Sequence, residues 1–116
     1  LFPSLGIKKY LSLVKQMDVV VGNSSSGLLE VPSLKIPTLN IGNRQQGRLQ
    51  AKSVFNCTND ISEINSALGS MIDNKFYNKI NFDNNPYGNG GASVNILKEI
   101  KKLKVPSTLE KEFFDL

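Results

Sequence analysis

The sequence predicts an α/β fold in which three parallel strands lie between two layers of helices. Apolar stretches of strand length alternate along the chain with helical patterns. Strands are expected at 19–22, 37–41 and 53–56, and helices at 6–17, at 27–33 and from Asp60 onward. Alternation of this kind forms βαβ units with parallel strands and right-handed crossovers. The 116 residues, of which 40% are hydrophobic, suffice for one core.

The first two elements are an amphipathic helix and a buried strand. Apolar residues recur at helical spacing in 6–17, with lysines and other polar residues between them. The apolar set is Ile7, Tyr10, Leu11, Val14 and Met17. Asp18 ends this pattern, and the strand at 19–22 follows.

The next helix and strand are short. Residues 27–33 are apolar almost all round, so this helix is expected to be buried. Pro32 lies late in the helix, and Pro37 opens the strand at 37–41. The loop that follows is too polar and too rich in glycine to belong to the core.

The third strand, at 53–56, leads to a helix with a clear start signal. Asp60 is the expected N-cap, and Glu63 is its capping-box partner three residues later. The expected buried stripe of this helix is Ile61, Ile64, Leu68 and Ile72. Cys57, the one cysteine, lies in an apolar stretch and is expected to be a small core residue.

The last part of the chain is a turn-rich segment, a helix and a tail. Residues 81–91 are dense in turn formers and are expected to form a surface loop. A helix over 91–103 has an apolar side of Val94, Leu97, Ile100 and Leu103. We expect a domain over 1–104 and a tail over 105–116, whose Phe113 and Phe114 pack on the domain or on a partner.

The turn after the first strand has the composition of a phosphate-binding site. Ser24, Ser25 and Ser26 follow the strand directly, and Gly27 begins a helix. The first turn of a helix leaves backbone N–H groups without partners and carries partial positive charge, so it favours an anion. The three hydroxyls add donors, and glycine lets the backbone approach a ligand closely.

Charged residues support this interpretation. Glu30 lies one turn into the helix, and Arg44 and Arg48 lie in the loop after the second strand. Serine before a helix is equally typical of an N-cap, and a lone loop arginine is usually solvated. The carboxyl ends of neighbouring parallel strands, however, form the edge where ligands bind, and arginine can grip phosphate with two parallel bonds. The conjunction therefore favours a ligand site.

Composition excludes several other functions. The chain has no histidine, so it has no Ser-His-Asp triad, no His-based metal site and no base to activate Cys57. The net charge of +4 owes much to lysines on the polar side of the last helix, which favours a solvated face over a nucleic-acid site. No apolar run approaches the ~20 residues of a membrane span. We expect no metal, cofactor, nucleic-acid or membrane partner.

Three stretches together resemble the UDP-N-acetylglucosamine 2-epimerase family, and most closely its hydrolysing branch, which supplies precursors of sialic acids. They are GNSSSG at 22–27, GNRQQGR at 42–48 and NPYGNG at 85–90, within a resemblance over roughly residues 5–93. It implies a cytoplasmic enzyme of the glycosyltransferase-B-like architecture, with two Rossmann-like domains. The chain begins at Leu1 and its sheet is small, so we expect it to be the last part of the C-terminal domain.

The resemblance also implies roles for particular residues. In the family the serine turn holds the UDP diphosphate, which corresponds to Ser24 and Ser25, with Ser26 and Gly27 beside them. The acidic residue holds the ribose, which corresponds to Glu30, and the loop arginine corresponds to Arg44. Leu5 corresponds to a position near the uracil. The catalytic carboxylates and histidine are expected upstream of Leu1, so this piece alone is expected to be inactive.

Two other interpretations stay open at this point. One is a glycosyltransferase of the same architecture, which also binds a UDP-sugar and transfers the sugar to an acceptor. The other is a non-catalytic module that binds a sugar phosphate, although Glu30 suits a ribose diol better than a second phosphate. The exact sugar and a homo-oligomeric state are not decided by these residues.

Overall fold

Three short parallel strands form the centre of this computed structural model, which describes residues 3–88 and 90–104. They are β1 (Val20–Gly22), β2 (Thr38–Ile41) and β3 (Val54–Cys57), hydrogen-bonded in the order β1-β2-β3. Both pairings are parallel, and the register aligns Val21 with Leu39 and Leu39 with Phe55. The predicted sheet is confirmed, with each strand beginning one residue later than expected.

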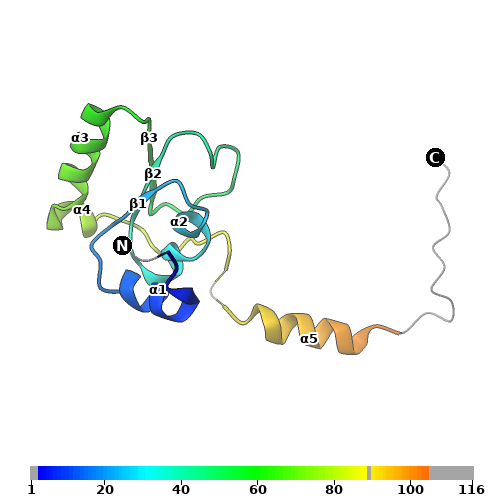
Figure 1. The fold of residues 1–116 in the computed structure, drawn as a ribbon. Helices are drawn as coiled ribbons and strands as arrows, with labels where there is room; N and C mark the ends of the chain where they lie inside the picture. Colours follow the sequence, from blue (N-terminus) through cyan, green and yellow to red (C-terminus); the bar gives the residue numbers. More distant parts are fainter. Residues whose placement is uncertain (1–2, 89, 105–116) are drawn as a thin grey trace, which may run out of the picture.

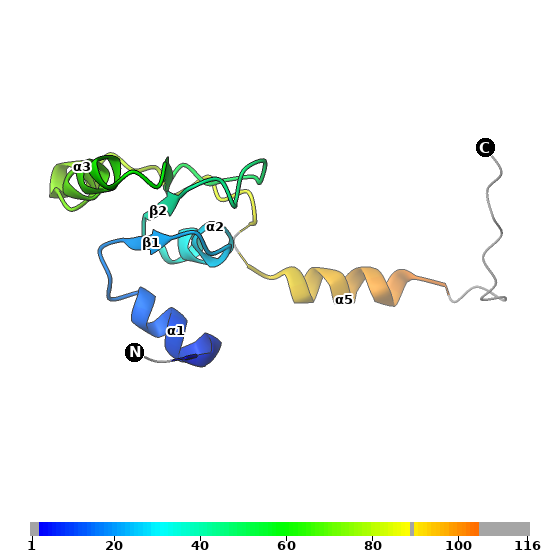
Figure 2. The same ribbon diagram turned by 45° about the horizontal axis from the view of Figure 1, so that its top comes forward.

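Helices cover both faces of the sheet. On one face lie α1 (Gly6–Val14), α2 (Ser26–Leu29) and the 3₁₀ helix η1 (Val31–Leu34). On the other face lies α3 (Ile61–Met71), followed by α4 (Asn74–Tyr77). Figure 2 shows the strands between α3 on one side and α1 on the other. This is a small α/β domain, as the alternation of strands and helices predicts.

The sheet divides the core into two apolar layers. On the α2 face, Leu28 packs with Ala51 and Val54, while Val31 of η1 contacts Val14 of α1. On the α3 face, a second cluster is formed by Leu39, Cys57 and Met71. The prediction that Cys57 is a core residue is confirmed.

The predicted helix at 27–33 is two shorter helices. The α-helical part stops at Leu29, and residues 31–34 form a 3₁₀ turn. Pro32 explains the break, because proline has no N–H to donate to the preceding turn. The segment is buried at Leu28 and Val31, as expected, although Leu29 reaches the surface.

Helix α3 begins at the predicted residue. The Asp60 carboxylate accepts a hydrogen bond from the Glu63 N–H at 3.0 Å, which is the expected N-cap. The reciprocal bond differs from the expected capping box. The Glu63 carboxylate accepts from the N–H and the hydroxyl of Thr58, which lies two residues before the cap.

The predicted buried stripe of α3 is partly wrong. Ile61 and Ile72 are 75% and 65% exposed, whereas Ile64 and Leu68 pack against the core. Each helical residue turns the face by about 100°, and the side that meets the sheet is centred toward Ala67 and Met71. Ile61 and Ile72 lie on the flank of that side.

The C-terminal helix stands apart from the sheet. Helix α5 (Ala92–Lys102) projects away from the other elements (Figure 1). Its apolar residues are all exposed, and among the described residues nothing covers them: Val94, Ile96, Leu97 and Ile100. Phe113 and Phe114 lie outside the described residues, as does the whole tail at 105–116.

The turn-rich segment before α5 is a surface loop that is fastened to the domain. The Tyr87 hydroxyl donates to the carbonyl oxygen of Leu49 at 2.9 Å. The Asn85 side-chain amide donates to the Ser33 hydroxyl at 2.9 Å. The loop therefore ties the end of η1 to the segment that enters β3.

Gly27 allows α2 to lie directly on β2. A Cβ atom at this position would stand 2.7 Å from the Thr38 methyl carbon. Thr38 cannot easily turn away, because its hydroxyl donates to the Gly27 carbonyl oxygen at 2.9 Å. The glycine thus has a packing role beside the ligand contact expected from the sequence, which stays a prediction.

Gly27→Ala is expected to lower the free energy of unfolding by about 1–3 kcal/mol through overpacking, as measured by urea denaturation. The double variant Gly27→Ala/Thr38→Ser removes the opposing methyl and keeps the hydroxyl, so it should recover much of the loss. Equal stability of the single and double variants would show that the Thr38 methyl is not the cause.

Candidate functional site

Residues from all three strand ends line one cavity. Asn23 follows β1, Gly42 to Arg44 follow β2, and Thr58 follows β3. Together with neighbouring residues they line an open cavity of about 690 Å³ at the carboxyl edge of the sheet. This is the edge at which open α/β sheets bind ligands.

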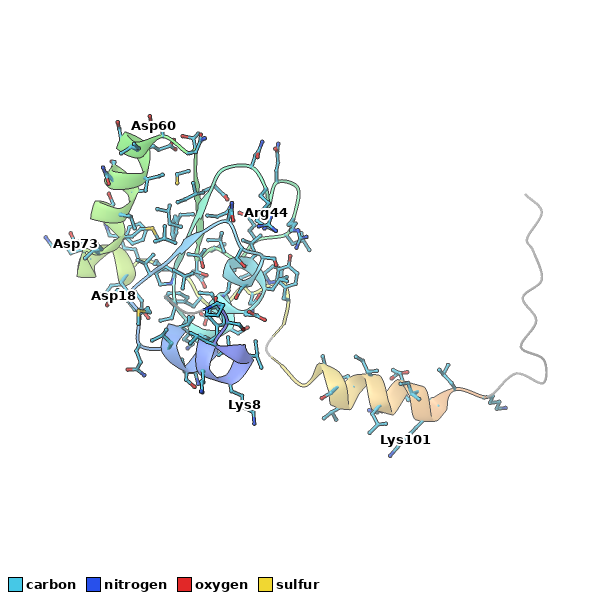
Figure 3. The ribbon with its side chains drawn as sticks, viewed as in Figure 1. Lys8, Asp18, Arg44, Asp60, Asp73 and Lys101 are labelled. Carbon is cyan, nitrogen blue, oxygen red and sulfur yellow. The ribbon has the colours of Figure 1, made fainter. Side chains whose placement is uncertain are left out.

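The arginine loop lies against the end of β1. The buried Gln45, 3% exposed, donates its side-chain amide to the Asn23 carbonyl oxygen at 2.7 Å. An Arg44 guanidinium nitrogen lies 3.5 Å from the Asn23 side-chain oxygen. Arg44 itself is exposed at the loop end of the sheet, far from Lys101 on α5 (Figure 3). The structure thus brings Arg44 next to the serine turn.

The serine turn offers free backbone donors. The Ser24 hydroxyl accepts from the Ser26 N–H at 3.3 Å, and Ser25 is the N-cap of α2 without a side-chain cap bond. Within the described part of the chain, the N–H groups of Ser24 and Ser25 have no acceptor. Helix α2 has only four residues, so its dipole is small. The free N–H groups and the serine hydroxyls therefore contribute more to anion binding than the dipole does.

Glu30 is joined to α1 through Ser26. The Ser26 hydroxyl donates to the Glu30 carboxylate atom Oε2, and it also lies 2.8 Å from the Tyr10 hydroxyl. All three side chains are half-buried. The helical spacing predicts for Tyr10 only a place on the apolar side of its helix. The tyrosine hydroxyl is the feature of the sequence that could have indicated a polar contact at this position.

Leu5 lies in a separate hollow beside this group. Residues Ser4 to Ile7 and Tyr10 line a volume of about 430 Å³ at the beginning of α1. Tyr10 borders this hollow and bonds Ser26, so the structure places Leu5 near the serine turn. Of the predicted UDP-binding residues, Arg44 lines the cavity at the sheet edge and Leu5 lines this separate hollow, while the serines and Glu30 line neither volume. Their ligand contacts stay predictions.

Arg48 belongs to a different hollow from Arg44. Side-chain amides line this second volume of about 430 Å³, which also borders the loop after β2. Asn40 donates to Asn56 at 2.8 Å, and Asn56 donates to Gln50 at 2.8 Å. These bonds hold side chains that line the hollow. The two volumes are neighbours that share Gly42, Asn43 and Asn56, but Arg48 lines only the second and Arg44 only the first.

Other reactive groups are few in the described residues. Burial raises the pKa of the Cys57 thiol, and the nearby Glu63 carboxylate raises it further. The thiol is therefore protonated and unreactive at neutral pH. In residues 3–88 and 90–104 no three His, Cys, Asp or Glu side chains are grouped to hold a metal ion. Over the same residues, no helix has the length and apolarity needed to cross a membrane.

A family model and two relatives match this chain over most of its length. Residues 1–101 match the family model described as UDP-N-acetylglucosamine 2-epimerase. Polysialic acid biosynthesis protein P7 of Escherichia coli is 37% identical over 114 residues, which are 97% of this chain and 29% of that protein.

Two further relatives carry epimerase names. GDP/UDP-N,N'-diacetylbacillosamine 2-epimerase (hydrolyzing) of Campylobacter jejuni is 38% identical over 117 residues, covering 100% of this chain and 30% of that protein. UDP-N-acetylglucosamine 2-epimerase of Neisseria meningitidis is 34% identical over 67 residues, 58% of this chain and 18% of that protein. The chain spans 29% and 30% of the length of the Escherichia and Campylobacter relatives.

Proposed function

The chain belongs to the UDP-N-acetylglucosamine 2-epimerase family, and we propose that it forms the nucleotide-binding part of a hydrolysing 2-epimerase. The supporting observation is the meeting of the serine turn and the Arg44 loop at the carboxyl edge of the sheet. The word hydrolyzing in the name of the Campylobacter relative supports this branch of the family. The substrate is a UDP-linked 2-acetamido sugar, of which UDP-N-acetylglucosamine is the simplest.

In this proposal the nucleotide extends from the hollow lined by Leu5 and Tyr10, past the serine turn, to the cavity lined by Arg44. The uracil lies near Leu5, the ribose hydroxyls donate to Glu30, and the diphosphate accepts from the donors of Ser24 and Ser25. Arg44 approaches the diphosphate from the loop after β2. The 3.5 Å bond from Arg44 to Asn23 is long and easily exchanged for a phosphate contact.

The proposed reaction has two steps. A base removes the proton from C2 of the sugar, the electron pair forms the C1–C2 double bond, and the anomeric C1–O bond breaks to release UDP. Water then adds to the double bond with inversion at C2. Negative charge grows on the β-phosphate during the first step, so donors fixed at that point lower the barrier. The chain supplies these donors, whereas the acid and base belong to another part of the enzyme.

The test uses the polypeptide that carries this chain, incubated with UDP-N-acetylglucosamine and followed by proton NMR. We expect free UDP and N-acetylmannosamine, with solvent deuterium incorporated at C2 when the reaction runs in D₂O. The same assay with an N,N'-diacetyl UDP-sugar identifies the preferred sugar. Formation of UDP only when an acceptor sugar is added would instead indicate a glycosyltransferase. Binding of hexosamine phosphate with no binding of UDP would indicate a sugar-phosphate module.

A further inference from the structure

Two hydroxyl groups and one carboxylate form a directed chain of hydrogen bonds from α1 to the end of α2. Glu30 in its ionised form can only accept, so the Ser26 hydroxyl proton is used on Glu30 Oε2. Ser26 has no second proton, and the 2.8 Å contact to Tyr10 is therefore donated by the tyrosine. The order of donation is Tyr10 to Ser26 to Glu30.

We propose that Tyr10 is a positioning residue that acts through Ser26 on Glu30 and thereby sets the affinity for the nucleotide ribose. The inference rests on the proposed function, because it takes Glu30 as the ribose acceptor. Among the described residues only the Oε2 atom of Glu30 has a hydrogen-bond partner, so Oε1 is open to a diol. The chain of bonds fixes the direction in which Oε1 points.

This arrangement changes the role expected for Ser26. Its hydroxyl proton is committed to Glu30, so it supports the carboxylate rather than the diphosphate. The phosphate donors that remain are the N–H groups and hydroxyls of Ser24 and Ser25. Ser24 and Ser25 therefore serve the diphosphate, and Ser26 serves the ribose through Glu30.

Tyr10 is well suited to hold this geometry. Its ring packs against the buried cluster of Val14, Val31 and Ile36, which joins α1 to the segment around η1. A tyrosine held by its ring has few rotamers, so its hydroxyl costs little conformational entropy to place. Tyr10 therefore links α1 to the carboxylate of Glu30, which directly follows α2.

The test compares UDP with 2',3'-dideoxy-UDP, which lacks both ribose hydroxyls, by calorimetry on the polypeptide that carries this chain. We expect Tyr10→Phe to weaken UDP binding about three- to tenfold, the effect of one hydrogen bond. Binding of the dideoxy nucleotide should change by less than about twofold, because it makes no contact with Glu30. Ser26→Ala should give the same pattern.

The matched control is Tyr77→Phe, which removes a tyrosine hydroxyl that donates to the Lys35 carbonyl oxygen at 3.0 Å, away from the site. It should leave both affinities unchanged. Equal losses for both nucleotides in Tyr10→Phe would mean a merely structural role, and no loss for either would also overturn the inference. Glu30→Gln serves as the reference for the proposed function.

The Glu30→Gln variant distinguishes the role of Tyr10 from the proposed ribose contact of Glu30. A preference for UDP over the dideoxy nucleotide that disappears in Glu30→Gln but is undiminished in Tyr10→Phe would reject the role of Tyr10 and leave the proposed function standing. Absence of UDP binding by the unmodified protein would contradict the proposed function, and the inference with it.

Discussion

Replacing Arg44 by alanine is expected to weaken UDP binding about 10- to 100-fold, the effect of losing charge-assisted hydrogen bonds worth about 1.5–3 kcal/mol. Arg44 is the cation placed beside the serine turn, within 3.5 Å of Asn23. Lysine cannot reproduce two parallel bonds to a phosphate, so Arg44→Lys should recover only part of the affinity. Titration calorimetry with UDP measures both variants.

Arg48→Ala is the matched control for this prediction. Arg48 lies in the same loop and carries the same charge, but it lines the hollow walled by side-chain amides rather than the Arg44 cavity. Its loss should change UDP affinity little, beyond a weak, salt-dependent effect of net charge. Equal losses in the two variants would show that the loop acts through its charge alone and that Arg44 has no specific place.

Leu39→Ala is expected to lower the free energy of unfolding by about 2–5 kcal/mol, the range found for large-to-small changes in cores. Leu39 is 0% exposed in the central strand and packs with Cys57 and Met71. The cavity left behind would lie between β2 and α3. In such a small sheet, few neighbouring side chains can move to fill it. Urea denaturation followed by circular dichroism measures the change.

The control is Val21→Ala, in the strand beside Leu39. Val21 pairs in register with Leu39 but is 43% exposed at the edge of the sheet. Truncation there removes little buried surface, so the loss should stay below about 1 kcal/mol. Similar losses at the two positions would mean that the burial of Leu39 is not the cause of its loss.

The strands and the start of α3 could be predicted because local chemistry decides them. Runs of apolar residues ended by glycine and asparagine define a strand, and Asp60 caps a helix with atoms from its own neighbourhood. The buried side of α3 could not be predicted as well. Ile61 is apolar but lies 75% exposed, because the angle at which the helix meets the sheet selects its buried face.

The candidate site shows the same division. The serines, Glu30 and Arg44 are visible in the sequence because they follow strand ends. Gln45 and Tyr10 were missed, since their partners lie 22 and 16 residues away along the chain. Nothing in the sequence around a polar loop residue or a helical tyrosine states which carbonyl or hydroxyl it will meet.

By itself the sequence determined the order of strands and helices, the edge of the sheet that carries the polar residues, and the family to which the chain belongs. Periodicity and capping depend on residues that are close together in the chain, so they can be recognised before the fold is known. Only the tertiary structure decided that Gly27 is required by the Thr38 methyl, that Arg44 and Arg48 face different hollows, and that Ser26 is bonded to Glu30. These facts depend on the distances between helices and strands, and the packing of the two core layers sets those distances.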